Sequence, residues 1–361
     1  MQNLQEEVKI KLPETIAAKG YAGHHSTDVL SPFSFERRKP GAKDVLIEIL
    51  YCGICHTDIH MLHNDWGITM YPIVPGHEIV GRVVEKGSLV KKFNVDDLAG
   101  VGCLVDSCRH CDNCKQGLEQ YCENGWTLTY NSFDKDGKTP TYGGYSNYIT
   151  VDEDYALKVS SKLNLRDVAP LLCAGITTYS PLRRWNIGPG MKVGVVGLGG
   201  LGHMAVKFAA SFGAEVTMLS TTPAKEADAR RFGASHFVNT NDPESLKTVA
   251  GKLDFILDTV AVEHDYNLYI SMLKFRGTLV CVGIPTANIA AAPLGVIFFG
   301  RSIAGSLIGG LPETQEMLDY CAEKNITSDT ELINIKDVNE CYDRLLKGDV
   351  RYRFVIDMST L

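Results

Sequence analysis

Two cysteines and one histidine from distant parts of the chain form a candidate zinc-binding set. Cys55 opens the stretch Cys-His-Thr-Asp-Ile-His at 55–60, His77 stands in Gly-His-Glu at 76–78, and Cys173 comes much later. Two thiolates and one imidazole leave the fourth tetrahedral position open for water or a substrate oxygen, which is typical of a catalytic rather than a structural zinc. The sequence therefore predicts a metal-assisted reaction at that open position.

A second group of cysteines has the spacing of a structural zinc site. Its four thiolates lie among polar residues and suit a closed tetrahedral site, which would fix a loop with too little apolar material to fold alone. An iron–sulfur cluster and a pair of disulfides are the alternatives. A zinc ribbon for nucleic acid is a further alternative, which the acidic residues around the group disfavour. The four residues are Cys108, Cys111, Cys114 and Cys122.

A glycine-rich turn in the second half of the chain predicts a dinucleotide site. The apolar stretch 191–196 leads into Gly-Leu-Gly-Gly-Leu-Gly at 197–202, and residues 203–212 have a helical pattern. In this order, the glycines allow a tight turn and close backbone approach, and the helix N-terminus faces a pyrophosphate. The expected cofactor contacts in this turn are Gly197, Gly199, Gly200, Leu201 and Gly202.

The end of the following strand, predicted at 215–219, favours NADP(H) over NAD(H). An NAD-binding unit carries an Asp or Glu here, which bonds the ribose hydroxyls. This chain has Ser220 instead, followed by Thr221, Thr222 and Lys225. Small hydroxyls and a cation can bind the 2′-phosphate that a carboxylate would repel. The alternative is that Thr221 and Thr222 only cap the next helix, since hydroxyls before a proline also do this.

These motifs need two domains to position them, as the length of 361 residues also suggests. Residues 1–172 read as an irregular β-rich domain, with strands at 44–51, 76–84 and 155–159 and a metal lobe at about 103–130. Residues 173–309 alternate strands and helices, which predicts a doubly wound parallel sheet. Residues 310–361 predict helices at 312–324 and 336–347 and a strand at 353–357, and this segment is expected to return to the first domain.

Composition excludes several other classes of function. The chain is 45% hydrophobic and 22% charged, and its formal net charge is -7 without a basic stripe, so we expect a small-molecule substrate and no nucleic-acid partner. No signal peptide or apolar run of about 18 residues is present, so we expect no membrane association. Eleven cysteines without a signal peptide predict reduced thiols and a cytoplasmic protein.

Six stretches between Asp44 and Gly310 together resemble the zinc-dependent medium-chain dehydrogenase/reductase superfamily and, within it, the cinnamyl alcohol dehydrogenase family. They are 52–60, 75–81, the four-cysteine lobe, 172–177, 197–203 and the turn at Ser220. The resemblance implies a GroES-like catalytic domain and a Rossmann domain, two zinc ions and NADP per chain, and a homodimer. It also implies interconversion of primary alcohols and aldehydes, mainly aldehyde reduction, with aromatic or allylic substrates.

The resemblance also implies roles for residues of the first metal set. Cys55, His77 and Cys173 would bind the catalytic zinc, and Glu78 could enter its coordination shell when no substrate is bound. Asp58 would orient His77, because such a carboxylate commonly fixes the tautomer of a ligand. The remaining roles are contact of Thr57 with the substrate oxygen, a proton path ending at His60, and cofactor contacts of His56, Thr177 and Gly283.

Several of these roles have plainer alternatives. His60 could be a surface histidine, Thr57 could serve only to start a helix, and Glu78 could pair with a buried arginine. Three aromatic residues, Trp126, Phe298 and Phe299, are candidates for a substrate pocket, with burial in the core as the leading alternative. For the whole chain, the alternatives are an NAD-linked polyol or secondary-alcohol dehydrogenase, and a non-catalytic protein that binds zinc and nucleotide.

Overall fold

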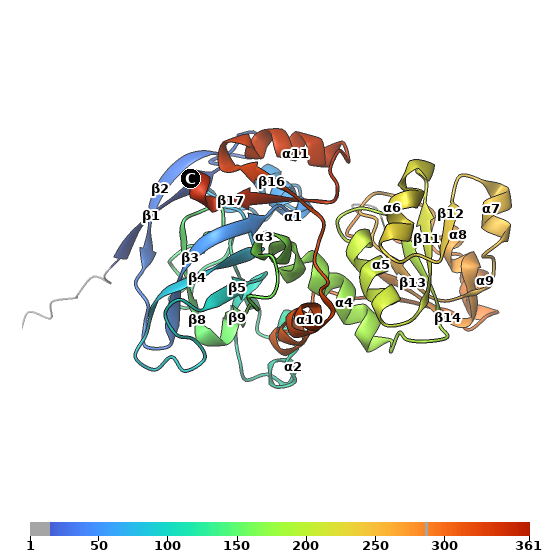
Figure 1. Cartoon of the computed structure of the whole chain (residues 1–361), viewed down its shortest axis with the longest axis horizontal. Helices are drawn as coiled ribbons and strands as arrows, with labels where there is room; N and C mark the ends of the chain where they lie inside the picture. Colours follow the sequence, from blue (N-terminus) through green and yellow to red (C-terminus); the bar gives the residue numbers. More distant parts are fainter. Residues whose placement is uncertain (1–14, 286–287) are drawn as a thin grey trace, which may run out of the picture.

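A computed structural model describes residues 15–285 and 288–361 and divides into two lobes (Figure 1). The β-rich lobe, at the left of the figure, combines the first part of the chain with its last strands, and the second lobe, at the right, contains β10 to β15. Residues 1–14, where the sequence predicts no signal peptide, lie outside the described residues. Within the described residues, no helix is both long and apolar enough to cross a bilayer.

The β-rich lobe is organised around a seven-stranded sheet with the order β16-β17-β3-β4-β5-β9, with β8 paired to β3. The central strand β3 is nearly all buried, because it pairs antiparallel with β17, β4 and β8 and carries a run of apolar residues. The pairing of β17 with β3 places the last strand of the chain in this lobe. The strands are β3 (Asp44–Gly53), β4 (Ile79–Lys86), β5 (Leu98–Val101), β8 (Tyr148–Asp152), β9 (Leu157–Lys158), β16 (Thr330–Asn334) and β17 (Arg353–Asp357).

Two predicted strands of this lobe are partly wrong. The strand expected at 76–84 begins only at Ile79, because Gly76 has a φ of 105° that no strand residue adopts. His77 and Glu78 therefore precede the strand and do not alternate across the sheet. The strand expected at 155–159 shortens to two residues, since Glu153–Tyr155 forms a 3-10 helix whose start is capped by the side chain of Asp152.

The second lobe contains a six-stranded parallel sheet with the order β12-β11-β10-β13-β14-β15. Strand positions alternate between two cores: Val193 and Val195 pack with α5 on one face, and Val196 packs with α8 on the other. The sheet is therefore doubly wound, as predicted. Its strands are β10 (Lys192–Val196), β11 (Glu215–Ser220), β12 (His236–Asn239), β13 (Leu253–Asp258), β14 (Leu273–Cys281) and β15 (Ser302–Gly305).

This strand order places a reversal between β10 and β13, so the carboxyl ends of these two strands flank a crevice where doubly wound folds bind their ligands. The helices of the second lobe are α5 (Gly202–Ser211), α6 (Glu226–Arg231), α7 (Pro243–Lys247), α8 (Tyr266–Met272) and α9 (Pro293–Ile297).

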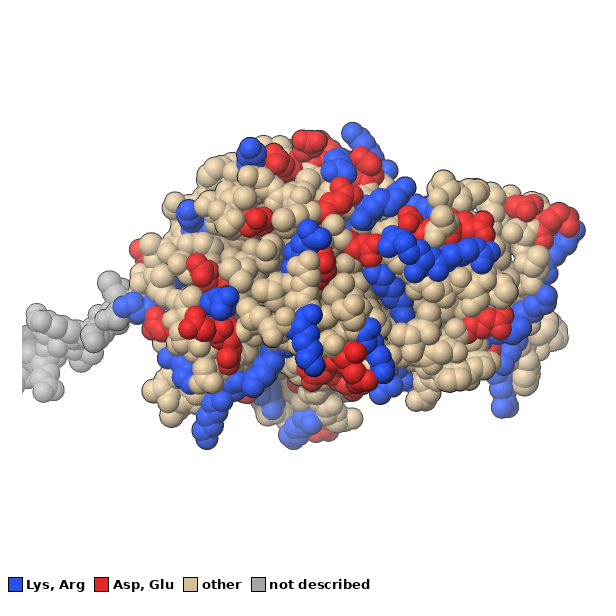
Figure 2. Space-filling model, viewed as in Figure 1, with Lys and Arg blue, Asp and Glu red and all other residues tan. Residues whose placement is uncertain are grey.

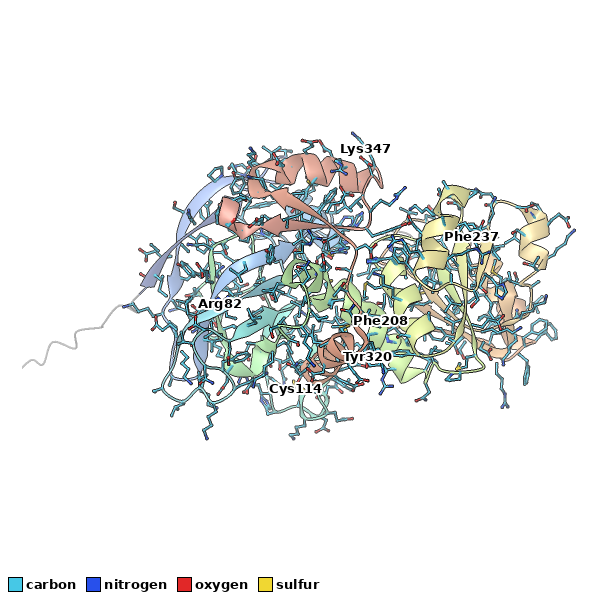
Figure 3. All side chains as sticks on the ribbon, in the orientation of Figure 1. Arg82, Cys114, Phe208, Phe237, Tyr320 and Lys347 are labelled. Atoms are coloured by element: carbon cyan, nitrogen blue, oxygen red, sulfur yellow. The ribbon has the colours of Figure 1, made fainter. Side chains whose placement is uncertain are left out.

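Aromatic side chains from three helices join the lobes. The ring of Tyr179 on α4 (Ala174–Arg184) lies 5.2 Å from that of Phe208 on α5 and 5.9 Å from that of Tyr320 on α10 (Leu311–Lys324). Figure 3 labels Phe208 and Tyr320 at this junction. The lobes therefore share a continuous apolar core.

The remaining elements are short or lie at the periphery of the β-rich lobe. They are β1 (Thr15–Ala22) and β2 (Ser31–Arg38), which pair with each other, β6 (Leu104–Ser107) and β7 (Trp126–Leu128), α1 (His56–His63), α2 (Asp112–Lys115), α3 (Leu165–Val168) and α11 (Val338–Leu346).

Candidate active site

Four side chains from three separate segments of the chain converge on one point. The candidate ligand atoms of Cys55, His77, Glu78 and Cys173 all lie within 4.8 Å of one another. Cys55 precedes α1, His77 and Glu78 precede β4, and Cys173 precedes α4, so each comes from a loop at the end of a regular element. The structure thus gathers the residues that the sequence predicted for the first metal site.

The chemistry of this donor set fits zinc. Two sulfur donors and an imidazole are the ligands of a catalytic zinc with three protein ligands. A hydrogen bond from Cys173 lowers the pKa of the Cys55 thiol well below its usual range, although burial opposes this, and the neighbouring His77 acts in the same direction as Cys173. A thiolate is the form of cysteine that binds metal.

The carboxylate of Asp58 contacts the Nδ1 side of the His77 ring. This buried carboxylate lies 3.4 Å from Nδ1 of His77 and accepts hydrogen bonds from the backbone N–H groups of Cys55, at 2.9 Å, and Gly76, at 3.1 Å. The hydroxyl of Tyr145 donates a third hydrogen bond, at 3.1 Å. With Nδ1–H facing this carboxylate, Nε2 is left to face a metal.

Glu78 pairs with a buried arginine, as the alternative to a metal-binding role predicts. It nevertheless also lies within the group of candidate metal ligands. Its Oε1 pairs with the guanidinium of Arg353, which also donates to the carbonyl of Ile54 at 2.8 Å. The second carboxylate oxygen, Oε2, is buried without a hydrogen-bond partner. Burial raises the pKa of Glu78 to about 7, and Arg353 opposes this shift. The unpartnered oxygen is the atom that could bind a metal.

Arg353 connects the metal group to the glycine turn and was not singled out from the sequence. A Cβ placed on Gly200 would lie 2.8 Å from Cδ of Arg353, so this arginine packs directly against the turn. Glu78 and nearby thiols raise the pKa of Arg353 despite its burial, which keeps the guanidinium charged. No local signal marks this residue, because it lies 275 positions from Glu78 in the chain.

The residues expected to form the proton path lie on α1. The Thr57 hydroxyl is 3.5 Å from the Cys55 sulfur, so it stands beside the metal group. His60 lies one turn further on and is partly exposed, with Nδ1 at 2.7 Å from Asp65. His56 is exposed, and its ring centroid lies 6.5 Å from that of His60. These side chains therefore lead from the metal group towards solvent.

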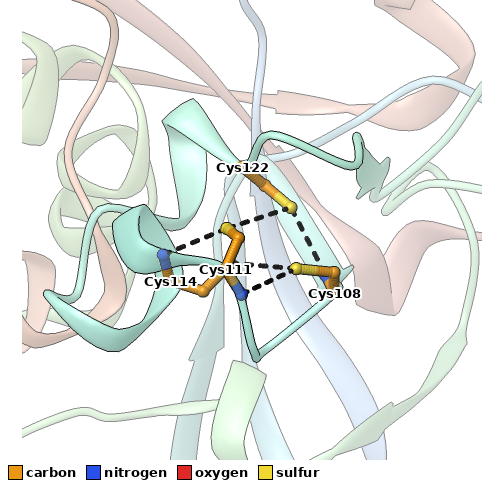
Figure 4. Close-up of side chains that lie close together, drawn as sticks. All are labelled: Cys108, Cys111, Cys114 and Cys122. Carbon is orange, nitrogen blue, oxygen red and sulfur yellow. Dashed lines mark hydrogen bonds between the residues drawn. The ribbon is translucent and has the colours of Figure 1, made fainter.

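The four cysteines of the second group lie close together (Figure 4), in a lobe that contacts the start of α10. The ligand atoms of its four cysteines lie within 4.8 Å of one another, and the closest sulfur pairs are 3.9 Å and 4.0 Å apart, too far for disulfide bonds. Backbone N–H groups donate to three of the sulfurs. A hydrogen bond from Asn124 lowers the pKa of Cys108 to about 5. The four donors suit a closed tetrahedral zinc.

The glycine turn has the backbone that its motif predicts. Gly197 has a φ of 84°, which favours glycine, and a Cβ on Gly202 would collide with the carbonyl oxygen of Gly197. Helix α5 starts at Gly202, so its first backbone N–H groups face the crevice.

The Ser220 turn reaches back to the glycine turn. Ser220 ends β11, and its Oγ accepts a hydrogen bond from the backbone N–H of Thr222. Thr221 and Thr222 are exposed, and Nζ of Lys225 donates to the carbonyl of Leu198 at 2.9 Å. Hydroxyls and one ammonium group therefore surround the end of the strand, where an adenosine ribose binds in this fold.

The other expected cofactor contacts occupy different positions around the crevice. Thr177 is buried on α4 and donates its N–H to the carbonyl of Cys173 at 2.9 Å. Gly283 follows β14, and its N–H lies 3.3 Å from the carbonyl of Asp258 at the end of β13. Gly283 thus borders the crevice between the central strands, whereas Thr177 lies one helical turn beyond the metal group.

The aromatic residues considered for a pocket are largely exposed. Phe298 and Phe299 are 73% and 47% exposed on the surface next to α9, so the alternative that they are core residues is wrong. Trp126 is also exposed, at the edge of the cysteine lobe. Cys103 forms a hydrogen bond with Cys173 that contributes to a raised pKa of the Cys173 thiol.

Comparison with known proteins identifies both halves of the chain. Residues 41–161 match the alcohol dehydrogenase GroES-like domain, and residues 200–323 match the zinc-binding dehydrogenase domain. The chain is 52% identical to NADP-dependent alcohol dehydrogenase C 1 of Mycolicibacterium smegmatis, over 94% of this chain and 98% of that protein.

Two solved structures are also similar. A cinnamyl alcohol dehydrogenase of Sorghum bicolor superposes with a TM-score of 0.92 at 44% identity, covering 95% of this chain and 98% of that one. The corresponding enzyme of Helicobacter pylori, complexed with NADP(H), gives 0.90 at 43% identity, covering 96% and 99%. The chain therefore belongs to the zinc-dependent medium-chain dehydrogenases/reductases and, within them, to the cinnamyl alcohol dehydrogenase family.

Proposed function

We propose that the chain interconverts primary alcohols and aldehydes with zinc and NADP(H), acting mainly as a reductase of aromatic or allylic aldehydes. The observation that carries this proposal is the direct connection between the candidate metal ligands and the glycine turn. Arg353 contacts Glu78 in the metal group and Gly200 in the glycine turn, so the two groups face each other across the lobes. Family membership supports the same chemistry.

Bound zinc supplies a Lewis acid that polarises a carbonyl oxygen, and bound NADPH supplies the hydride. The chain itself must hold the reactants and move a proton. Cys55, His77 and Cys173 are the proposed metal ligands, and Asp58 fixes the orientation of His77 through the contacts described above. Thr57 carries a hydroxyl that can accept and donate beside the metal group, so it is placed to give the product oxygen its proton.

His60 is the proposed outer end of the proton path. Its partly exposed ring can exchange protons with solvent, and the Asp65 carboxylate at 2.7 Å orients it. His56, in the preceding turn of α1, is proposed to contact the cofactor pyrophosphate. Glu78 is proposed to bind the metal through Oε2 when no substrate is present, because that oxygen is buried without another partner.

For the cofactor, we propose that the glycine turn holds the pyrophosphate and that Ser220, Thr221, Thr222 and Lys225 hold the 2′-phosphate. Ser220 stands where an NAD-binding unit carries an Asp or Glu, and this difference favours NADP(H) over NAD(H). Replacing Ser220 with Asp should lower the ratio of kcat/KM for NADPH to that for NADH by about 100-fold, because it brings like charges together. An unchanged ratio would contradict this placement.

The oligomer proposed here is a homodimer formed through the second lobe. β15 is one of the two edge strands of the parallel sheet, and exposed apolar residues lie on its neighbour β14 and in the segment from α9 to the start of β15. We call this surface the β15 patch; it comprises Phe275, Leu294, Ile297, Phe298 and Phe299, each at least 47% exposed. Such a contiguous apolar surface marks an interface. By light scattering, Phe298→Asp should give a monomer, whereas Leu346→Asp, at a position that is 58% exposed on the other lobe, should remain dimeric.

We further propose that the functional divisions are residues 1–172, 173–309 and 310–361, with the structural zinc lobe at about 103–130, and that the protein works in the cytoplasm.

Metal analysis combined with kinetics tests the proposed zinc-dependent reduction of aldehydes. Wild-type protein should contain two zinc ions per chain and should reduce aromatic and allylic aldehydes with NADPH at higher kcat/KM than aliphatic ones.

The Cys173→Ala variant should retain one zinc and lose turnover, while Cys341→Ala, a matched change in the core on α11, should keep two zincs and its activity. Normal rates in the Cys173 variant would refute the assignment of the metal site. A wild-type chain with two zincs but no turnover on any aldehyde or alcohol would favour a binding protein instead.

A further inference from the structure

The segment between α11 and β17 carries an arginine from the β-rich lobe to the second lobe. Nε of Arg351 lies 3.7 Å from the carboxylate of Asp228 on α6. The next residue, Tyr352, is buried, donates its hydroxyl to the same carboxylate at 2.5 Å and stacks on His203 with ring centroids 5.3 Å apart. The backbone N–H of Arg351 donates to Glu331 at 2.7 Å. The backbone at Arg351 is therefore held in place, and its side chain, which is 54% exposed, extends towards α6.

Arg351 shares its surroundings with Lys225, one of the proposed 2′-phosphate ligands. Lys225 lies just before α6, three residues from Asp228, and its Nζ reaches the carbonyl of Leu198 in the glycine turn. Burial lowers the pKa of Lys225, and the charge of Arg351 lowers it further. The two cations therefore repel each other in the free protein, on the side of β11 where the cofactor adenosine is proposed to bind.

Four cations lie around two carboxylates at this seam. Figure 2 shows Lys and Arg side chains interspersed with Asp and Glu along the boundary between the lobes. Asp228 and Asp329 are the carboxylates that pair with three of these cations, and Lys225 donates to the carbonyl of Leu198 instead, so the set has two more positive than negative charges. A phosphate monoester carries roughly −1.5 to −2 charges at neutral pH and would neutralise the excess. The cations are Lys207, Lys225, Arg231 and Arg351.

We propose that Arg351 is a specificity-determining residue that binds the 2′-phosphate of NADP(H) from the opposite lobe. This inference rests on the proposed placement of that phosphate at Ser220 and Lys225. A guanidinium pairs well with phosphate because its fixed donors match two oxygens at once. In the free protein, Asp228 holds the guanidinium nearby. Since Arg351 belongs to the β-rich lobe, NADP(H) gains at its adenosine end a bond between the lobes that NAD(H) cannot form.

The test compares two nucleotides that lack the nicotinamide half. Adenosine 2′,5′-bisphosphate and adenosine 5′-monophosphate are titrated by calorimetry into wild-type protein and into the Arg351→Gln, Arg351→Lys and Arg230→Gln variants. Arg230 is the matched control, because it is exposed on α6 and its guanidinium donates to the Glu226 carboxylate and the Ser235 carbonyl. Arg351→Gln should weaken the bisphosphate about tenfold, as expected for one charged hydrogen-bonded contact.

The other outcomes are equally specific. Arg351→Gln should leave affinity for the monophosphate within about twofold, Arg351→Lys should keep most of the preference because the charge remains, and Arg230→Gln should change neither affinity. Equal weakening of both nucleotides by Arg351→Gln, or no change in either, would overturn the role of Arg351.

Failure of the underlying cofactor placement looks different. In that case wild-type protein would not distinguish the two nucleotides, or Ser220→Asp would leave the distinction intact. A third result would refute the inference about Arg351 alone. In that result, wild-type protein prefers the bisphosphate, Ser220→Asp abolishes the preference, and Arg351→Gln leaves it unchanged.

Discussion

Acid should weaken the folded state through one buried histidine, His203. Its ring is fully buried at the start of α5, and its two nitrogens are both engaged. Nδ1–H donates to the carbonyl of Gly199 at 3.2 Å, and Nε2 accepts the backbone N–H of Asp329 at 3.2 Å. Protonation of Nε2 would turn it into a donor that faces the backbone N–H donor of Asp329. Burial, with the charges of Lys207 and Arg353, lowers the pKa of His203 to about 3.

The size of the effect follows from proton linkage. A histidine with an unfolded pKa of about 6.5 binds protons more tightly in the unfolded chain than in the folded one, so its neutral form contributes stability that is complete above pH 6.5 and lost as pH falls towards 3. When the pH falls from 8 to 5.5, protonation of His203 in the unfolded chain should lower the free energy of unfolding by about 1.4 kcal/mol. The loss should reach about 2 kcal/mol at pH 5.

The assay compares wild-type protein with His203→Asn, which keeps a donor for Gly199 but cannot titrate. Urea unfolding is followed by tryptophan fluorescence at pH 8.0, 6.5 and 5.5. Protonation of the zinc ligands affects both proteins alike, so the difference between their unfolding free energies isolates His203 and should shrink by about 1.4 kcal/mol. A difference independent of pH, or an NMR titration of His203 near pH 6.5, would refute the reasoning.

Two further changes probe the metal sites. Cys111→Ala should remove one zinc and lower the melting temperature by roughly 10 °C, because metal binding holds the cysteine lobe together; metal analysis and calorimetry check this, and an unchanged melting temperature would show that the lobe folds without its metal. Tyr145→Phe removes a hydrogen bond to Asp58 and should weaken the zinc bound by His77 about tenfold, as measured by competition with a chelator. Tyr148→Phe on β8 is the matched control, and equal zinc affinity in both variants would contradict a positioning role for Tyr145.

The sequence predicts best those features whose signal is local. The cysteine spacing at 108–122 and the glycine pattern at 197–202 each identify themselves within a short window, because zinc and pyrophosphate impose fixed residue types on nearby positions. The doubly wound sheet is also predictable, since its strands read as apolar runs separated by helices. The fold class and the family expectation are both confirmed.

Contacts between distant segments account for what the sequence does not reveal. Arg353 reads only as the first residue of a strand, yet it joins Glu78 to the glycine turn. Tyr145 has no motif around it, and its role appears only when its hydroxyl meets Asp58, 87 positions away. The strand predicted at 76–84 starts late for a related reason: the backbone turns at Gly76 to bring its N–H to Asp58.

The pairing of β17 with β3 has a consequence for how the protein is made. A ribosome releases β3 early, but the strand that completes its sheet emerges only after all six strands of the parallel sheet have been synthesised. The nucleotide-binding half can therefore fold as a unit while the sheet of the other half still has an open edge. Arg353 arrives with that late strand, so the nascent chain acquires the link between its metal donors and its cofactor turn as one of its final folding events.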